Sequence, residues 1–155
     1  MTVDLLTLLL LGGGLFLGWA LGANDSANVF GTAVGTRMLR FRTAAILCSI
    51  GVILGAVISG AGPTETLGKL AAIKSIAEAS IASACAGMTV LFMTRRGLPV
   101  STSQAVVGAL VGWNIWNGFD TDMQVASKIM LTWVLCPFLA AGIAALLLPI
   151  TSFAL

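Results

Sequence analysis

Histidine and tyrosine are absent from this chain of 155 residues, and charged side chains make up only 9% of it. Without histidine, the chain has no histidine metal ligand and no histidine for acid–base catalysis. The three cysteines are far apart in apolar runs, so they form no CxxC motif and are expected to be small buried hydrophobic residues. Because a soluble domain carries about 25% charged residues, the shortage of charge excludes the soluble class.

Apolar residues take the place of the missing charge. They make up 58% of the chain, and the mean hydropathy is +1.04. This composition predicts an all-α polytopic membrane protein. The net charge of +2 is too small and scattered for nucleic-acid binding. The sequence contains no nucleophile–base pair or metal cluster, so we expect neither an enzyme nor a resident cofactor.

Five apolar stretches are separated by charged residues or by Gly/Pro breaks: residues 5–23, 43–61, 76–94, 98–116 and 125–150. Most are close to the length that crosses a bilayer, although re-entrant segments would lower the number of crossings. The first stretch follows Asp4 and has no Lys or Arg before Arg37, so we expect a retained helix rather than a signal peptide. We predict one transmembrane unit over residues 1–155, in the cell membrane.

A polar cluster follows the first stretch, at Asn24, Asp25, Ser26 and Asn28. One interpretation is a helix cap at the water interface, because Asn and Asp are good capping residues. The other interpretation is favoured, because the chain stays apolar beyond the cluster until Arg37. An ionisable residue inside a membrane segment typically marks a functional site.

A second polar group follows Pro99, at Ser101, Thr102, Ser103 and Gln104. Proline ends the preceding helix, and Ser101 with Gln104 fits the capping box of a new one. The group is either a capped helix start or an anion site made of hydroxyls and free N–H groups at membrane depth. The residues of this stretch leave both interpretations open.

The two polar groups are compatible if a cation lies between them. A carboxylate alone would repel an anion held at the second group, but Asp25 with a bound Na⁺ or H⁺ would not. Amide and hydroxyl oxygens are suitable ligands for a hard cation. Together the two groups predict a cation-coupled anion site.

Both groups resemble signatures of the inorganic phosphate transporter family (PiT, solute carrier 20). "GANDSANVFGTAVG" is similar to that family's GANDVANAFGTxVG, and "GLPVSTSQAVVGALVGW" resembles its PVSTTHAxVG segment. The resemblance covers essentially the whole chain and implies uptake of inorganic phosphate driven by Na⁺ or H⁺. Carried over by position, it implies phosphate binding by five residues: Asn24, Asn28, Ser101, Thr102 and Ser103.

Two departures from the family pattern concern the cation. Gln104 stands where histidine is common, which removes a titratable group and favours sodium as the coupling ion. We assign sodium to Asp25, Asn28 and Gln104. Ser26 replaces a common valine and is expected to add a hydroxyl near the site.

The chain has one copy of the Asn–Asp signature, whereas family members normally carry two inverted halves. It resembles the N-terminal half, which implies one half of an inverted-repeat transporter with broken or re-entrant helices. The second half would be an antiparallel copy of the chain, giving a homodimer, or a separately encoded C-terminal half. The alternatives are sulfate transport, as in the related permease branch, and a non-transporting subunit that only packs against a partner.

Overall fold

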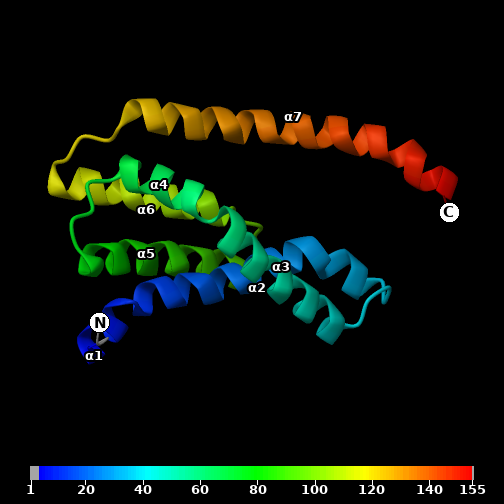
Figure 1. Ribbon diagram of the computed structural model, residues 1–155, viewed down its shortest axis with the longest axis horizontal. Helices are drawn as coiled ribbons and strands as arrows, with labels where there is room; N and C mark the ends of the chain where they lie inside the picture. Colours follow the sequence, from blue (N-terminus) through cyan, green and yellow to red (C-terminus); the bar gives the residue numbers. More distant parts are fainter. Residues whose placement is uncertain (1–3, 155) are drawn as a thin grey trace. The chain divides into compact units, whose positions relative to one another are not determined.

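The computed structural model describes residues 4–154, with side chains described through Pro149. The elements over these residues are seven helices: α1 (Leu5–Leu10), α2 (Gly12–Gly35), α3 (Phe41–Ser59), α4 (Ala61–Leu70), α5 (Ile76–Arg95), α6 (Thr102–Asn117) and α7 (Met123–Ala154). The prediction of an all-α protein is confirmed. The chain divides into two compact units, Met1–Thr121 and Asp122–Leu155, and each is described by itself (Figure 1).

Four helical stretches among the described residues are long and apolar enough to cross a membrane: Leu5–Gly35, Phe41–Ser59, Ile76–Arg95 and Met123–Pro149. They account for four of the five predicted apolar stretches. The other stretch, 98–116, forms α6, whose 16 residues extend about 24 Å. That length is less than the roughly 30 Å of a bilayer's hydrocarbon core.

Helices α2 and α5 pack along each other and run in the same direction (Figure 1). Residue numbers rise together along the contact, since Gly13 meets Ser80 and Phe16 meets Gly87. A Cβ on Gly13 would collide with the Ser80 carbonyl, and a Cβ on Gly87 would lie 2.8 Å from Cδ1 of Phe16. Glycine therefore allows the two backbones to approach closely, as is typical of membrane helices.

Helices α5 and α6 form a helical hairpin, and its turn, residues 96–101, lies against the middle of α2. The second residue of the turn, Gly97, lies in the left-handed region, at φ 69°. The turn ends at Ser101, whose hydroxyl accepts a hydrogen bond of 3.4 Å from the Gln104 N–H, as the capping box predicts. Asn24, half-way along α2, donates a hydrogen bond to this turn.

Asn114 holds the open end of the hairpin together. Its side chain is fully buried in α6, with 0% exposure. Its Nδ2 donates to the Leu70 carbonyl at 3.0 Å and to Oγ1 of Thr121 at 3.2 Å, and its Oδ1 accepts from the Ala72 N–H at 3.1 Å. One side chain thus joins α6 to the end of α4, to the start of the next loop and to the segment before α7.

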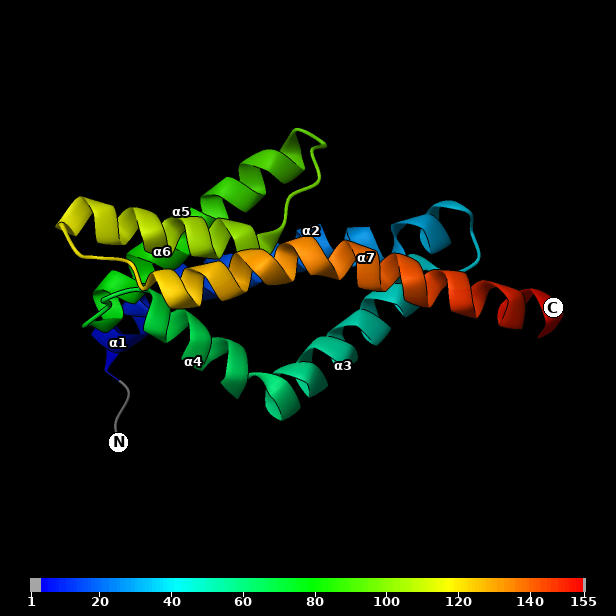
Figure 2. The ribbon, with the colours of Figure 1, turned by 90° about the horizontal axis from the view of Figure 1, so that it is seen from above.

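Helix α4 lies between the second and third predicted apolar stretches, where no helix was expected. Pro63 lies in its first turn, where a missing N–H breaks no helical hydrogen bond. Helices α3 and α4 meet at Gly60 and change direction there (Figure 2). The glycines and the proline of this segment suggested a break, but a proline in the first turn does not prevent a helix.

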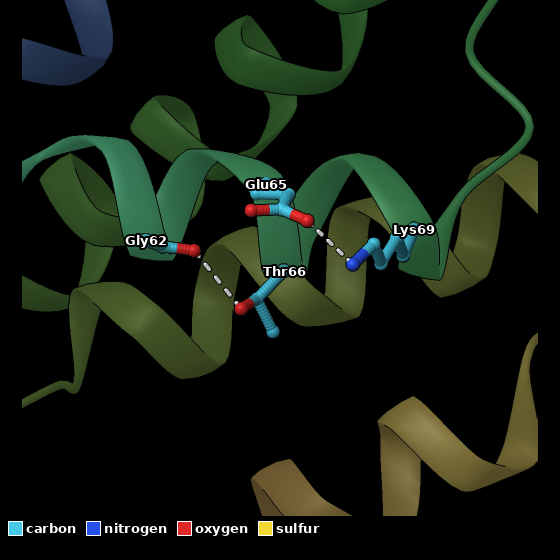
Figure 3. A network of polar contacts seen from close by, with 4 residues as sticks. All are labelled: Gly62, Glu65, Thr66 and Lys69. Atoms are coloured by element: carbon cyan, nitrogen blue, oxygen red, sulfur yellow. Dashed lines mark hydrogen bonds and ion pairs between the residues drawn. The ribbon is translucent and has the colours of Figure 1, made fainter.

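The exposed face of α4 carries local polar contacts (Figure 3). The Lys69 ammonium donates to Oε1 of Glu65 at 2.6 Å, one helical turn away, and the Thr66 hydroxyl donates to the Gly62 carbonyl at 3.0 Å. The hydrogen bond and the positive charge of Lys69 hold the pKa of Glu65 below its ordinary value. Exposed pairs of this kind contribute little to stability.

Helix α7 forms the second unit. Oδ1 of Asp122 accepts hydrogen bonds from the Gln124 N–H at 2.9 Å and the Val125 N–H at 3.1 Å, which caps the helix start. Pro137 and Pro149 lie inside the helix without ending it. The stretch from Met123 to Pro149 is one of the four candidate spans.

Candidate functional site

The Asn–Asp cluster lies in the middle of α2, not at its end. The helix continues through the cluster from Gly12 to Gly35. The helix-cap interpretation is therefore wrong, and the interpretation of a cluster inside an apolar helix is the one that fits. Asn24 and Asn28 are four residues apart, so they lie on one face of α2.

Asn24 joins α2 to the last turn of α5 and to the hairpin turn. Its side chain is buried, with 4% exposure. Its Nδ2 donates to the Val100 carbonyl at 2.9 Å and to Oδ1 of Asp25 at 2.7 Å, and its Oδ1 accepts from the Thr94 hydroxyl at 3.1 Å. Both amide hydrogens are used, so the buried amide holds the turn against α2.

Asp25 connects α2 to the first turn of α6. Its Oδ1 accepts a second hydrogen bond, from the Thr102 hydroxyl at 3.2 Å, and Thr102 is itself buried. Within residues 4–154, no side chain or N–H donates to Oδ2 of Asp25. One carboxylate oxygen is therefore fixed by two donors, while the other is available to a ligand.

A cavity of about 220 Å³ lies beside these contacts. It is lined by Asn24, Ala27, Asn28, Thr94, Gly97, Leu98 and Pro99. These residues come from α2, from the last turn of α5 and from the hairpin turn. Two amide side chains, one hydroxyl and the turn itself therefore surround one small cavity.

The remaining predicted site residues are more exposed. Four of them are exposed, and only Asn28 among these lines the cavity: Asn28, Ser101, Ser103 and Gln104. The Ser101 hydroxyl is used as the cap of α6. In the part of the chain that the structure describes, no hydrogen bond joins Ser103 or Gln104 to Asp25. Sodium binding by Asp25, Asn28 and Gln104 stays a prediction.

Ser26 faces away from the cavity. Its hydroxyl donates to the Gly22 carbonyl of the same helix. It lines a larger, mainly apolar groove of about 480 Å³ between α2 and α3. Ser26 was expected near the site, but it lies two residues after Asn24, which turns its side chain by about 200° around the helix, so its hydroxyl does not line the cavity.

Thr94 and Val100 belong to the site but were not expected from the sequence. Val100 contributes its backbone carbonyl, and because every residue has a backbone carbonyl, the residue type could not indicate this role. Thr94 had a weak signal, because it is a hydroxyl residue at the end of an apolar stretch, just before the turn with the second polar group. Its bond to Asn24 depends on a helix 70 residues away in sequence.

Two arginines lie where α5 ends and the hairpin turn begins. Arg95 and Arg96 are exposed, and they lie in sequence between Thr94 and Gly97, which both line the cavity. The Arg96 guanidinium lies 4.5 Å from the centre of the Phe92 ring. Within the described residues neither arginine forms an ion pair, so this end of the hairpin carries uncompensated positive charge.

Comparison with known proteins identifies the family of the chain. The sequence matches the family described as "Phosphate transporter family" over residues 21–155. The chain belongs to the phosphate transporter family. The resemblance inferred from the two polar motifs is therefore confirmed. As a member of the phosphate transporter family with four candidate spans, the chain is a multi-pass membrane protein.

Relatives of this family member carry the name "Putative phosphate permease". One from Pyrococcus furiosus is 35% identical over 150 residues, covering 88% of this chain and 35% of the relative. One from Mycobacterium bovis is 32% identical over 155 residues, covering 86% of this chain and 28% of the relative. The chain thus spans about a third of the length of these relatives. No solved structure matches the chain.

Proposed function

We propose that this chain takes part in sodium-coupled transport of inorganic phosphate, with Na⁺ at Asp25 and phosphate at the start of α6. The observation that carries the proposal is the 3.2 Å hydrogen bond between the Thr102 hydroxyl and Oδ1 of Asp25. It brings the predicted cation ligand within one hydrogen bond of the predicted anion site. Family membership and the names of the relatives support phosphate as the anion.

The start of α6 offers several donors to an oxyanion. The N–H groups of Thr102 and Ser103 lie in its first turn, where a helix supplies no carbonyl partner. The Ser103 hydroxyl is exposed beside them. The unpaired charges of Arg95 and Arg96 attract an anion toward the turn. Converging N–H, hydroxyl and positive charge are the groups that bind phosphate in proteins.

Asp25 couples cation binding to anion binding. An isolated carboxylate inside an apolar helix is unfavourable, and a bound cation removes that penalty. It also removes the repulsion between Asp25 and an anion at α6. By linkage, Na⁺ and phosphate then raise each other's affinity by the same factor. Gln104 in place of a histidine removes a titratable side chain, which favours Na⁺ over H⁺ as the coupling ion.

We also propose that a second, inverted repeat completes the site. Asn28, Ser103 and Gln104 are exposed although they lie in otherwise apolar segments, and polar groups at membrane depth need a protein partner or a water-filled cavity. The repeat is supplied either by a second copy in the opposite orientation or by a C-terminal half. Accessibility of a single cysteine at the C-terminus tests this. Labelling from one side only, in a preparation that transports without a second protein, contradicts the antiparallel pair.

The transport proposal is tested by uptake of labelled phosphate into proteoliposomes, with and without a Na⁺ gradient at constant ionic strength. We expect Na⁺ to stimulate uptake, and Asp25→Asn to abolish that stimulation because only the charge is removed. Asp120→Asn is the matched control, since Asp120 lies exposed in the loop after α6. Uptake indifferent to Na⁺, or full stimulation in Asp25→Asn, contradicts the proposal. Preferred uptake of sulfate supports the alternative of a sulfate transporter. No uptake of either anion supports a subunit that only packs against a partner.

A further inference from the structure

We propose that Thr94 is a positioning residue for the cation site and acts on Asp25 through Asn24. The inference rests on the proposed function, which assigns a cation to Asp25. Three side chains form a continuous chain of hydrogen bonds from α5 to α2. The Thr94 hydroxyl donates to Oδ1 of Asn24 at 3.1 Å, and Nδ2 of Asn24 donates to Oδ1 of Asp25 at 2.7 Å.

Only one orientation of the Asn24 amide satisfies its neighbours. The Val100 carbonyl and the Asp25 carboxylate are acceptors, so the amide nitrogen must face both of them. Its oxygen then points to Thr94, whose hydroxyl is the donor that Oδ1 has among the described residues. In the reversed orientation, the amide oxygen would face a carbonyl and a carboxylate with no hydrogen between them.

The orientation of Asn24 decides which oxygen of Asp25 is free. Asn24 and Thr102 both donate to Oδ1, and no donor among the described residues occupies Oδ2. Without the Thr94 hydroxyl, the buried oxygen of Asn24 loses its donor, which is unfavourable where water is excluded. The amide then turns toward another partner and its donation to Asp25 weakens. Thr94 therefore keeps the carboxylate preorganised for the cation, although it does not contact the cation itself.

The test compares two substitutions of Thr94. Thr94→Val keeps the shape and removes the hydroxyl, and we expect it to raise the Na⁺ concentration for half-maximal phosphate uptake about tenfold. The maximal rate at saturating Na⁺ should change little, because bound Na⁺ holds Asp25 in the same position in the variant. Thr94→Ser keeps the hydroxyl and is expected to restore the half-saturation to within about twofold of the original protein.

Thr89→Val is the matched control on the same helix. Thr89 is exposed, and its hydroxyl donates to the Cys85 carbonyl one turn earlier at 3.0 Å. The same chemical change there should leave the Na⁺ dependence unaltered. Uptake is measured in membrane vesicles from cells that produce the protein with any partner it assembles with. A second readout is the protection by Na⁺ against thermal unfolding, measured without phosphate.

The outcomes separate this inference from the proposed function. A Thr94→Val protein with the original Na⁺ half-saturation in both readouts overturns the positioning role. Equal impairment of Thr94→Val and Thr94→Ser also overturns it, because packing rather than the hydroxyl would then be responsible. Na⁺-independent uptake by the unchanged protein contradicts the proposed function and the inference with it, and the unchanged protein alone reveals that outcome.

Discussion

Replacement of Asn114 by alanine is expected to destabilise the open end of the α5–α6 hairpin. The substitution removes all three hydrogen bonds of this buried side chain at once. The N–H of Ala72 and the carbonyl of Leu70 then lack partners. Since these bonds connect α6 to the segment between α4 and α5, their loss lets the two ends of the hairpin separate.

The size of the effect follows from the burial of the groups left unpaired. Each buried polar group without a partner costs about 1–3 kcal/mol. Leu70 is 1% exposed, so its carbonyl stands near the upper end of that range. Ala72 and Thr121 are half-buried and recover part of their hydrogen bonding from water. Together these contributions give a loss of about 2–4 kcal/mol in the free energy of unfolding.

The assay compares Asn114→Ala with Asn117→Ala, a control one turn further along α6. Asn117 is exposed and donates a single hydrogen bond of 2.9 Å to the Trp113 carbonyl of its own helix. The control should change stability by about 0.5 kcal/mol or less, as surface substitutions usually do. Unfolding of both variants in detergent gives the free energies, and amide hydrogen exchange at Ala72 reports the local opening. Equal destabilisation by the two variants, or unchanged exchange at Ala72, would refute the reasoning.

Two further predictions concern the packing of α2 on α5 and the ion pair of α4. Gly13→Ala should lose about 1–3 kcal/mol because its Cβ collides with the Ser80 carbonyl, as in other overpacked sites. Gly14→Ala should be neutral, since nothing lies within 4 Å of its Cβ; thermal unfolding that ranks the two variants the other way contradicts the packing. Lys69→Met should raise the pKa of Glu65 toward its ordinary value, because it removes the hydrogen bond and the charge that lower that pKa. The small stabilisation from the pair is present above the unfolded-state pKa of Glu65 and is lost as the pH falls through its folded-state pKa; NMR titration checks the shift, and an unchanged pKa in Lys69→Met contradicts it.

The sequence allowed the class, the family and the two polar groups of the site to be predicted. Low charge and long apolar stretches determine the membrane class, because few other folds tolerate them. The start of α6 was also predictable, since Ser101 and Gln104 form a local motif. These features depend on residues that are close together in the sequence, so a local sequence pattern is enough to predict them.

The missed features depend on helical phase or on distant partners. Ser26 was expected near the site because it is adjacent to Asp25 in sequence, but in the continuous helix α2 it lines a groove with α3. The role of Thr94 requires its contact with Asn24, and no pattern within either segment indicates that contact. Helix α4 was missed because Pro63 was counted as a break, although proline is harmless in a first turn.

The hairpin turn brings the carboxyl end of one helix and the amino end of another to the same place. The aligned peptide dipoles give the end of α5 a partial negative charge and the start of α6 a partial positive charge. The backbone alone therefore offers one pole to a cation and the other to an anion, a few residues apart. Broken helices in transporters use their two ends in this way. Removing the hydroxyls of Ser101 or Ser103 should then weaken anion binding without abolishing it, because the backbone polarity survives every side-chain substitution.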